Sequence, residues 1–354
     1  MRVARHVAAA LVVAVVSVTP ALAGPALLFD PSNGKVLYAE DQDNQWHPAS
    51  LTKIMTAYLT FEALKAGKLT LEQKIPVSEN AHNQPPSKVG LPVGAEMTVE
   101  LAIRALIVKS ANDVAVMLAE AIGGSEEAFV KQMNETAQRL GMTRTRFVNP
   151  HGLPAPEQVT TARDLAKLVR AVLQDFPERA SLWGLADIQI GRRRLRTHNG
   201  LLRTYEGADG LKTGFICDSG YNIVASASRD GRKLVAVVLG EVSGRERSVR
   251  AASLLEHGFQ TYGWKQIFDT TTLDTLPMVA DARDAISIRQ SVVSWNCGGK
   301  RPPRRLIARK NKGKGHAPAR QQADSGKASK GAPVAAAPTQ AALKTKVNAT
   351  RAPQ

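Results

Sequence analysis

Ser50 and Lys53 lie three residues apart at the predicted start of a helix. Residues at positions i and i+3 share one helix face, so the lysine ammonium can come within hydrogen-bond reach of the serine hydroxyl. A lysine that is partly buried, or that lies near another cation, loses its proton more readily and can then act as a base. The pair is therefore a way to activate a serine nucleophile without histidine. By itself the spacing is common, and the simpler interpretation is an N-cap serine beside a solvated lysine.

Two further short motifs follow in the chain. Ser-Ala-Asn at 110–112 interrupts a helical pattern, and Lys-Thr-Gly at 212–214 leads into a strand-like stretch. Taken separately, the first is explained by breaker residues between two helices and the second by a solvated strand lysine. Their presence together, in this order after Ser50 and Lys53, favours a shared chemical site.

Hydrophobic periodicity and turn signals predict the elements that position these motifs in the first half of the chain. A turn at 31–34 separates two apolar runs and predicts a hairpin. Thr98, Ser125 and Thr161 each precede an apolar stripe at helical spacing, so each is expected to cap a helix. These elements are a hairpin at 26–38, a helix from Ser50 to Gly67, a helix from Thr98 that pauses at 110–113 and resumes, and helices ending near Leu140 and Phe176.

Strand signals return in the second half. The predicted elements are strands at 188–195, 222–227, 233–238 and, weakly, 285–288, and a helix at 245–262 whose Val249, Leu254, Leu255 and Phe259 face inward. The order of hairpin, helical block, strands and final helix predicts an α+β fold. In it, an antiparallel sheet is closed by segments from both ends of the chain and flanked by helices, with an inserted helical region.

The N-terminus has the pattern of an export signal. Arg2 and Arg5 precede an apolar run at 7–18, and Ala-Leu-Ala at 21–23 offers a cleavage site before Gly24. We therefore expect residues 1–23 to be a signal peptide, with an uncleaved N-terminal anchor as the alternative. The expected location is the periplasm or cell envelope.

The positive charge of the chain is concentrated at the other end. The 354 residues carry a formal charge of +16, of which residues 300–354 contribute +13, with 14 Lys and Arg and one acid. We expect a catalytic domain at 24–268, a short extension at 269–299 and a basic tail at 300–354 that lacks the apolar content to fold. The tail has no Phe, Trp or Tyr for base stacking, so nucleic acid is not an expected partner.

Two cysteines, Cys217 and Cys297, are present. Export permits a disulfide, but one cysteine lies near the candidate site and the other beside the basic tail. We therefore predict no structural bridge and interpret Cys217 as a small buried residue. The seven histidines show no metal-ligand spacing, so a metal site is not expected.

The three motifs together resemble those of the serine penicillin-recognising enzymes. The wider sequence, at 48–56, 147–153, 209–214 and 219–222, resembles the D-alanyl-D-alanine carboxypeptidases, which are low-molecular-mass penicillin-binding proteins. The resemblance covers about residues 25–265. It implies the serine β-lactamase/DD-peptidase fold, a peptidoglycan stem peptide as substrate, release of its terminal D-alanine, and inhibition by β-lactam antibiotics.

The resemblance also implies roles for the motif residues. Ser50 would attack the scissile carbonyl, Lys53 would accept its proton, Ser110 would relay a proton to the leaving amine, and Asn112 would position Lys53 and hold a substrate amide.

On the substrate-binding side, Lys212 and Thr213 would bind the terminal carboxylate. Gly214 completes this motif, and the N–H groups of Ser50 and Phe215 would form the oxyanion hole.

Three alternatives stay open. A DD-endopeptidase that cleaves cross-links would use the same residues. A class A β-lactamase normally has Asp at the position of Ala111 and a loop glutamate, for which Glu157 is offered in an unsuitable setting. A non-catalytic penicillin-binding wall protein would not need the complete set of motif residues.

The extension at 269–299 is too short for a second β-rich domain, and the tail lacks the apolar face of a membrane anchor. Electrostatic association of the tail with anionic membrane or wall polymer is one expectation, and a solvated, easily proteolysed extension is the alternative.

Overall fold

The computed structural model describes residues 24–294 and residue 297. The predicted signal peptide at 1–23 and tail at 300–354 lie outside these residues. In chain order the elements are β1 Ala26–Phe29, β2 Val36–Glu40, the 3-10 helix η1 Ala49–Thr52, α1 Lys53–Lys65, β3 Lys74–Pro76, α2 Glu79–Asn83, β4 Glu96–Thr98, α3 Val99–Val108, α4 Asn112–Gly123, α5 Glu126–Arg139, α6 Ala162–Asp175, the 3-10 helix η2 Pro177–Gly184, β5 Asp187–Ile190, β6 Arg193–Arg196, α7 Leu201–Thr204, β7 Ala208–Ile216, β8 Gly220–Arg229, β9 Arg232–Glu241 and α8 Gly244–Phe268.

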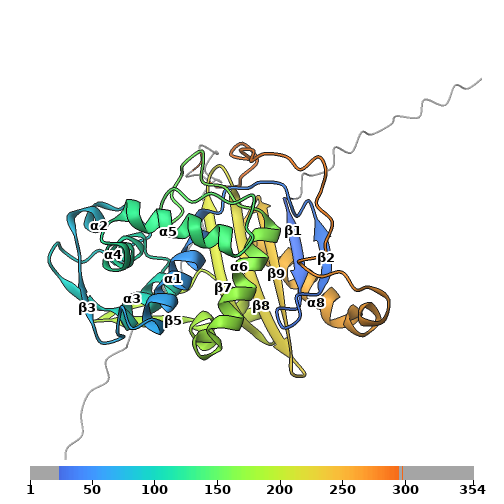
Figure 1. Cartoon of the computed structure of the whole chain (residues 1–354), viewed down its shortest axis with the longest axis horizontal. Coiled ribbons are helices and arrows are strands. Elements are labelled where there is room, and N and C mark those ends of the chain that lie inside the picture. Colours follow the sequence, from blue (N-terminus) through green and yellow to red (C-terminus); the bar gives the residue numbers. More distant parts are fainter. Residues whose placement is uncertain (1–23, 295–296, 298–354) are drawn as a thin grey trace, which may run out of the picture. The chain divides into compact units, whose positions relative to one another are not determined.

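The main sheet is antiparallel and combines both ends of the domain, as predicted. Its strand order is β2-β1-β9-β8-β7, so the N-terminal hairpin pairs with the C-terminal strands through β1 and β9 (Figure 1). Leu27 lies opposite Val237 and Leu28 opposite Ala236 in this pairing. β7, which carries the Lys-Thr-Gly motif, is an edge strand, and its free edge is available to an extended ligand.

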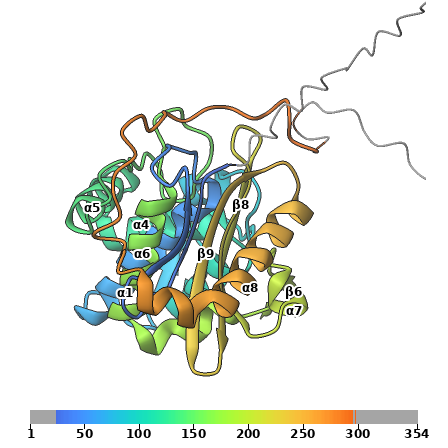
Figure 2. The same ribbon diagram turned by 90° about the vertical axis from the view of Figure 1, so that its right-hand side faces the viewer.

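Both faces of the sheet are buried, because side chains alternate between two hydrophobic clusters. Leu27 and Val235 belong to the cluster shared with the helical block, whereas Leu28 and Ala236 pack toward α8. α8 covers one face of the sheet and α1 and α6 lie on the other (Figure 2). Although α8 is 25 residues long, no helix in the described part of the chain has both the length and the apolar character needed to cross a bilayer.

The predicted helix starts are confirmed because their signals are local. The hydroxyls of Thr98, Ser125 and Thr161 accept hydrogen bonds from backbone N–H groups three residues ahead, at 3.3, 3.2 and 3.0 Å. The predicted interruption at 110–113 is the junction between α3 and α4, where Ser110 has a φ of 59°.

Three predictions about the second half were wrong. Residues 188–195 form no single strand: β5 and β6 make a separate hairpin that turns at Gly191, whose φ is +56°. The segment at 285–288 is not a strand, because its Ile288 N–H instead donates to the carbonyl of Asp218. Val249 is 57% exposed, since α8 turns Leu254 and Leu255 toward the sheet and leaves Val249 outside that stripe.

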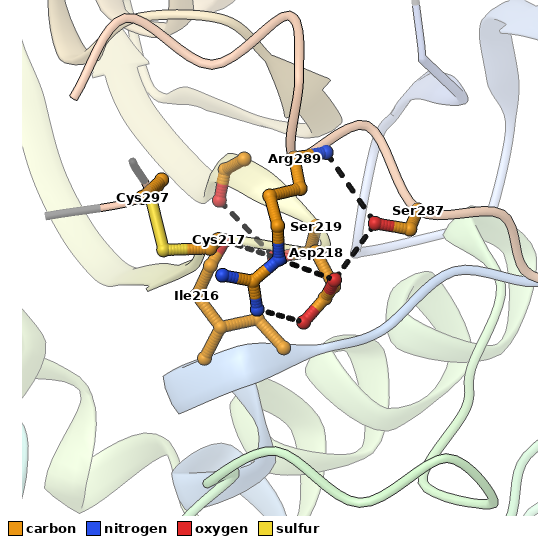
Figure 3. Close-up of a disulfide and its surroundings, with 8 residues drawn as sticks. Ile216, Cys217, Asp218, Ser219, Ser287, Arg289 and Cys297 are labelled. Atoms are coloured by element: carbon orange, nitrogen blue, oxygen red, sulfur yellow. Dashed lines mark hydrogen bonds and ion pairs between the residues drawn. A yellow bond between two sulfur atoms is a disulfide. The ribbon is translucent and has the colours of Figure 1, made fainter. Parts of the chain in front are cut away.

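The prediction of unpaired cysteines was also wrong. Cys217 and Cys297 form a disulfide with their Cα atoms 5.3 Å apart (Figure 3), and Cys217 is half-buried rather than buried. The two residues are 80 positions apart. Their pairing depends on the chain after α8, which runs back along the domain. In chain order, the Leu273 N–H bonds to the Gly34 carbonyl, the Arg283 N–H to Asn44 Oδ1 and the Ile288 N–H to the Asp218 carbonyl. Spacing alone does not encode that return path.

Candidate active site

The turn that carries Ser50 is held from two sides by backbone that only glycine permits. A Cβ on Gly152 would lie 1.8 Å from the carbonyl oxygen of Ala49, and Gly152 has a φ of +85°. A Cβ on Gly214 would lie 2.8 Å from the carbonyl oxygen of Pro48 and 3.1 Å from the Ser50 nitrogen. These contacts place the 3-10 turn η1 between the loop around Gly152 and strand β7.

Lys53 lies one turn after Ser50 and is 1% exposed. Its Nζ is 3.0 Å from Ser50 Oγ, 2.7 Å from Asn112 Oδ1 and 2.5 Å from the carbonyl oxygen of His151. Burial, and secondarily the charge of Lys212, lowers the pKa of Lys53 well below its usual value of 10.5.

A neutral Lys53 amine is matched by its surroundings. It has two N–H donors and one lone pair, whereas the two carbonyl oxygens around it can only accept. When the amine is neutral, its two N–H groups can go to Asn112 Oδ1 and the His151 carbonyl, which leaves the lone pair for the Ser50 hydroxyl. This arrangement can remove the proton from Ser50 Oγ.

The junction between α3 and α4 supplies the opposite wall. Asn112 Nδ2 donates to the carbonyl of Pro85 at 2.8 Å, which directs Oδ1 at Lys53. Ser110 and Ala49, with φ values of 59° and 48°, are two of the non-glycine residues with a left-handed backbone. Such strain persists only where the surrounding structure holds it, and it often marks functional sites.

Strand β7 brings Lys212 to this wall. Its Nζ donates to Ser110 Oγ at 2.8 Å and to the carbonyl of Thr213 at 3.0 Å. Burial, and then the charge of Arg247, lowers the pKa of Lys212 to about 7. The site thus holds two of the buried lysines of the described residues, Lys53 beside Ser50 and Lys212 beside Ser110.

Sequence reasoning missed Arg247, which lies in the first turns of α8 and is 7% exposed. Its guanidinium donates to the carbonyl of His198 at 3.3 Å, and its Nε has no hydrogen-bond partner among the described residues. Burial lowers the pKa of Arg247 to about 10. A buried cation that no carboxylate neutralises within the described part of the chain suits an anionic ligand.

The sequence contained one signal that could have identified Arg247. It lies four, seven and eight residues before Ala251, Leu254 and Leu255, so a basic residue falls on the apolar stripe of the helix.

These residues open onto one cleft with a volume of about 570 Å³. All the predicted site residues come together here. Six line the cleft directly, and the other two, Lys53 and Lys212, contact lining residues. The six are Ser50, Ser110, Asn112, Thr213, Gly214 and Phe215. The cleft therefore brings the Ser50 hydroxyl and the Lys53 amine together with the basic side chains of Lys212 and Arg247.

The neighbouring segments position these groups. Asn222 in β8 is fully buried and donates to the carbonyl of His47 at 3.1 Å, which ties the sheet to the residues before Ser50. The Thr56 hydroxyl donates to the carbonyl of Pro150 at 2.6 Å and fixes the next loop on α1.

His151 reaches the cleft through both its backbone and its ring. Burial lowers the pKa of its imidazole to about 3, so the ring is neutral near pH 7, and its Nδ1 accepts the Leu153 N–H at 3.2 Å. Glu126 lies 3.8 Å from His151 Nε2, but the low pKa argues against an ion pair there. Glu157, the residue considered for a β-lactamase, pairs with Arg146 at 2.9 Å, is 66% exposed, and is not among the cleft residues.

Comparison with known proteins agrees with this geometry. The profile of the family described as D-alanyl-D-alanine carboxypeptidase, peptidase S11, matches residues 13–243. The chain is 37% identical over 243 residues to the D-alanyl-D-alanine carboxypeptidase DacC of Escherichia coli (strain K12), covering 67% of this chain and 61% of that protein. It is 35% identical over 242 residues to DacF of Bacillus subtilis (strain 168), covering 67% and 62%. The chain thus spans about three fifths of the length of these curated relatives.

Solved structures agree as well. Penicillin-binding protein 5 from Haemophilus influenzae aligns with a TM-score of 0.65 at 36% identity, covering 67% of this chain and 71% of that one. Penicillin-binding protein 6B from Escherichia coli aligns with a TM-score of 0.64, also at 36% identity, covering 67% and 77%. These alignments confirm the predicted fold class. Because the family profile matches well over half of its residues, the chain belongs to the D-alanyl-D-alanine carboxypeptidase family, peptidase S11.

Proposed function

We propose that the protein is a serine-type D-Ala-D-Ala carboxypeptidase. It removes the terminal D-alanine from peptidoglycan pentapeptide stems through an acyl-enzyme on Ser50, and β-lactams such as penicillin acylate the same serine. The observation that carries the proposal is the burial of Lys53, whose Nζ lies 3.0 Å from Ser50 Oγ.

Acylation follows from this geometry. Lys53 Nζ takes the hydroxyl proton as Ser50 Oγ attacks the carbonyl of the terminal peptide bond. The N–H groups of Ser50 and Phe215 stabilise the oxyanion. The C–N bond then breaks, and Ser110 passes a proton to the leaving amine of D-alanine. Water hydrolyses the resulting ester, which releases the shortened peptide and restores the Ser50 hydroxyl.

The cationic end of the cleft recognises the substrate terminus. Lys212, Arg247 and the Thr213 hydroxyl bind the carboxylate of the terminal D-alanine, and their position selects an exopeptidase mode of cleavage. A peptide without a free terminal carboxylate would leave these cations unpaired and so bind weakly.

Release of free D-alanine from a muramyl-pentapeptide mimic tests the proposal. The expected result is stoichiometric D-alanine and tetrapeptide, and prior incubation with penicillin blocks both. Cleavage of a cross-linked dimer without D-alanine release from the pentapeptide would assign the protein as an endopeptidase instead.

The pH dependence of kcat/KM is expected to be bell-shaped. Lys53 must be neutral to accept a proton, so the rate rises with pH through its lowered pKa. Lys212 must be charged to bind carboxylate, so the rate falls as pH passes through its pKa of about 7. Lys212→Arg stays charged above that pH and should remove the falling limb. An unchanged falling limb in this variant would show that another group titrates there.

Arg247→Gln is expected to raise KM by about 10- to 100-fold and to alter kcat less, because a charge-assisted hydrogen bond to the substrate carboxylate is lost. The same change should raise the free energy of unfolding by about 1 kcal/mol, because it removes a buried charge that lacks a counter-ion. Steady-state kinetics and denaturant unfolding measure the two effects. Arg245→Gln, at an exposed position of the same helix, is the matched control. Lower activity together with lower stability would indicate a structural role alone.

We also propose that residues 1–23 direct export, that residues 24–268 form the catalytic domain, and that the basic residues 300–354 attract the protein to anionic membrane or wall polymer. A chain that lacks 300–354 should co-sediment less with anionic vesicles or purified wall at low salt. Added salt should abolish the difference, because exposed charges are screened. Equal sedimentation of both chains at low salt would refute the role of the tail.

A further inference from the structure

The C-terminal extension is attached to the rest of the domain by buried contacts. The guanidinium of Arg163, 4% exposed, pairs with Asp43 at 2.6 Å and also donates to the carbonyl of Pro277 in the extension at 2.7 Å. Breaking such a buried pair is costly because it leaves a charge unpaired away from water. The extension lies after residues 13–243, which the family profile matches, so its attachment is a feature that the profile does not cover.

The far end of the extension is attached to the turn between β7 and β8. Arg289 Nη2 donates to Asp218 Oδ2 at 2.9 Å, and the Ile288 N–H donates to the Asp218 carbonyl, also at 2.9 Å (Figure 3). The disulfide between Cys217 and Cys297 joins the same turn to the extension covalently. Because the ion pair between Asp218 and Arg289 is partly exposed, it restrains the turn only weakly. The disulfide is therefore the main attachment of this turn.

This turn directly follows the strand that carries the proposed oxyanion-hole donor. The donor, the Phe215 N–H, lies two residues before Cys217. Phe215 is opposite Tyr221 in the pairing of β7 with β8, and the centroids of their rings are 4.3 Å apart. β7 is an edge strand, so within the described sheet only β8 holds it from the side. The position of the Phe215 N–H relative to Ser50 therefore depends on β8 and on the turn that the extension holds.

We propose that the disulfide, acting through the β7–β8 turn, positions the Phe215 N–H for the oxyanion, so that the rate of Ser50 acylation depends on the thiol–disulfide state of Cys217 and Cys297. The inference rests on the proposed function. Cys217 and Asp218 are positioning residues in this scheme, because they act through the backbone of β7. Both cysteines are half-buried rather than buried, so a small thiol can reach them.

Reduction by a dithiol such as dithiothreitol is a balanced exchange. One thiolate of the reagent attacks a sulfur of the disulfide, which displaces the other cysteine as a thiolate. The second thiol of the reagent then closes on the mixed disulfide, so the reagent becomes a cyclic disulfide and both cysteines end as thiols. Two electrons pass from the reagent to the protein. The extension should keep its contact with Arg163 but no longer hold the turn covalently.

The time course of labelling by a fluorescent penicillin, before and after reduction and removal of the reagent, tests the proposal. The reduced protein should have an acylation rate constant about tenfold lower, because a displaced oxyanion donor stabilises the transition state less. The dissociation constant that precedes acylation should change little, since Lys212 and Arg247 are not altered. Reoxidation should restore the rate constant.

The fraction of protein that finally labels separates positioning from stability. Partial unfolding would lower this fraction and leave the rate constant of the remaining protein unchanged, and that result would overturn the proposal. An unchanged rate constant and an unchanged fraction would also overturn it, while leaving the proposed function intact. Failure of the disulfide-bonded protein to label or to release D-alanine would instead count against the proposed function.

Substitutions test the same attachment without a reductant. The double variant Cys217→Ser, Cys297→Ser should acylate like the reduced protein and should not respond to dithiothreitol. Arg283→Gln, which removes an exposed ion pair with Asp41 elsewhere on the extension, is the matched control and should acylate like the parent protein. If the double variant does not fold, Asp218→Asn in the disulfide-bonded protein decides, because it weakens the second attachment of the turn. A rate constant lowered by about threefold supports the proposal, and a wild-type value overturns it.

Discussion

Ser50→Ala is expected to lower kcat/KM for D-alanine release by about 10⁴-fold or more, because it removes the hydroxyl that forms the acyl-enzyme in the proposed mechanism. Labelling by fluorescent penicillin should disappear with it. Ser50 is only half-buried, and its removal leaves the Asn112 and His151 contacts of Lys53 in place. The free energy of unfolding should therefore change by less than about 1 kcal/mol.

The matched control for this experiment is Ser181→Ala, at an exposed serine in η2. It should label and turn over like the parent protein. Persistent penicillin labelling of the Ser50→Ala protein would mean that another residue is the nucleophile.

Lys53→Arg is expected to lower kcat/KM by about 10³-fold, since a guanidinium stays protonated and cannot accept the Ser50 proton. The change keeps the positive charge, so it separates the role of a base from that of a fixed cation. Lys53→Met removes both and should be similarly inactive. Measured rates of acylation by penicillin, together with those of D-alanine release, locate the defect in the first chemical step.

The same substitution at Lys212 provides the comparison. Lys212→Arg keeps the cation that the substrate carboxylate needs, so it should retain much more activity than Lys53→Arg. Thermal unfolding of both variants controls for the larger side chain. If the two variants lose activity equally, or if Lys53→Arg stays active, then Lys53 does not act as the base.

Local sequence signals were sufficient to predict many of the helices and strands. The caps at Thr98, Ser125 and Thr161 depend on hydrogen bonds across three residues, and a single sequence contains that information. The prediction of a single strand at 188–195 was wrong even though it also depended on local signals. Strand signals at 188–195 predict extended backbone, but Gly191 turns the chain back and makes two strands.

Other features of the structure depend on contacts between residues far apart in the sequence, which sequence patterns do not predict. The disulfide joins residues 80 positions apart because the C-terminal extension follows the domain back to Asp218. Arg247 was missed because the charge on an apolar stripe became meaningful only once α8 packed beside His198 and Lys212.

By itself, the amino-acid sequence determined the fold class, the helix starts and the identity of the motif residues around Ser50 and Lys53, because these depend on short spacings and on residue type. Only the tertiary structure decided their chemical environment. Asn112 Oδ1 and the His151 carbonyl lie within hydrogen-bond distance of Lys53 Nζ, and burial lowers the pKa of Lys53. Desolvation and these hydrogen-bond partners depend on groups distant in the chain, so they exist only in the packed molecule.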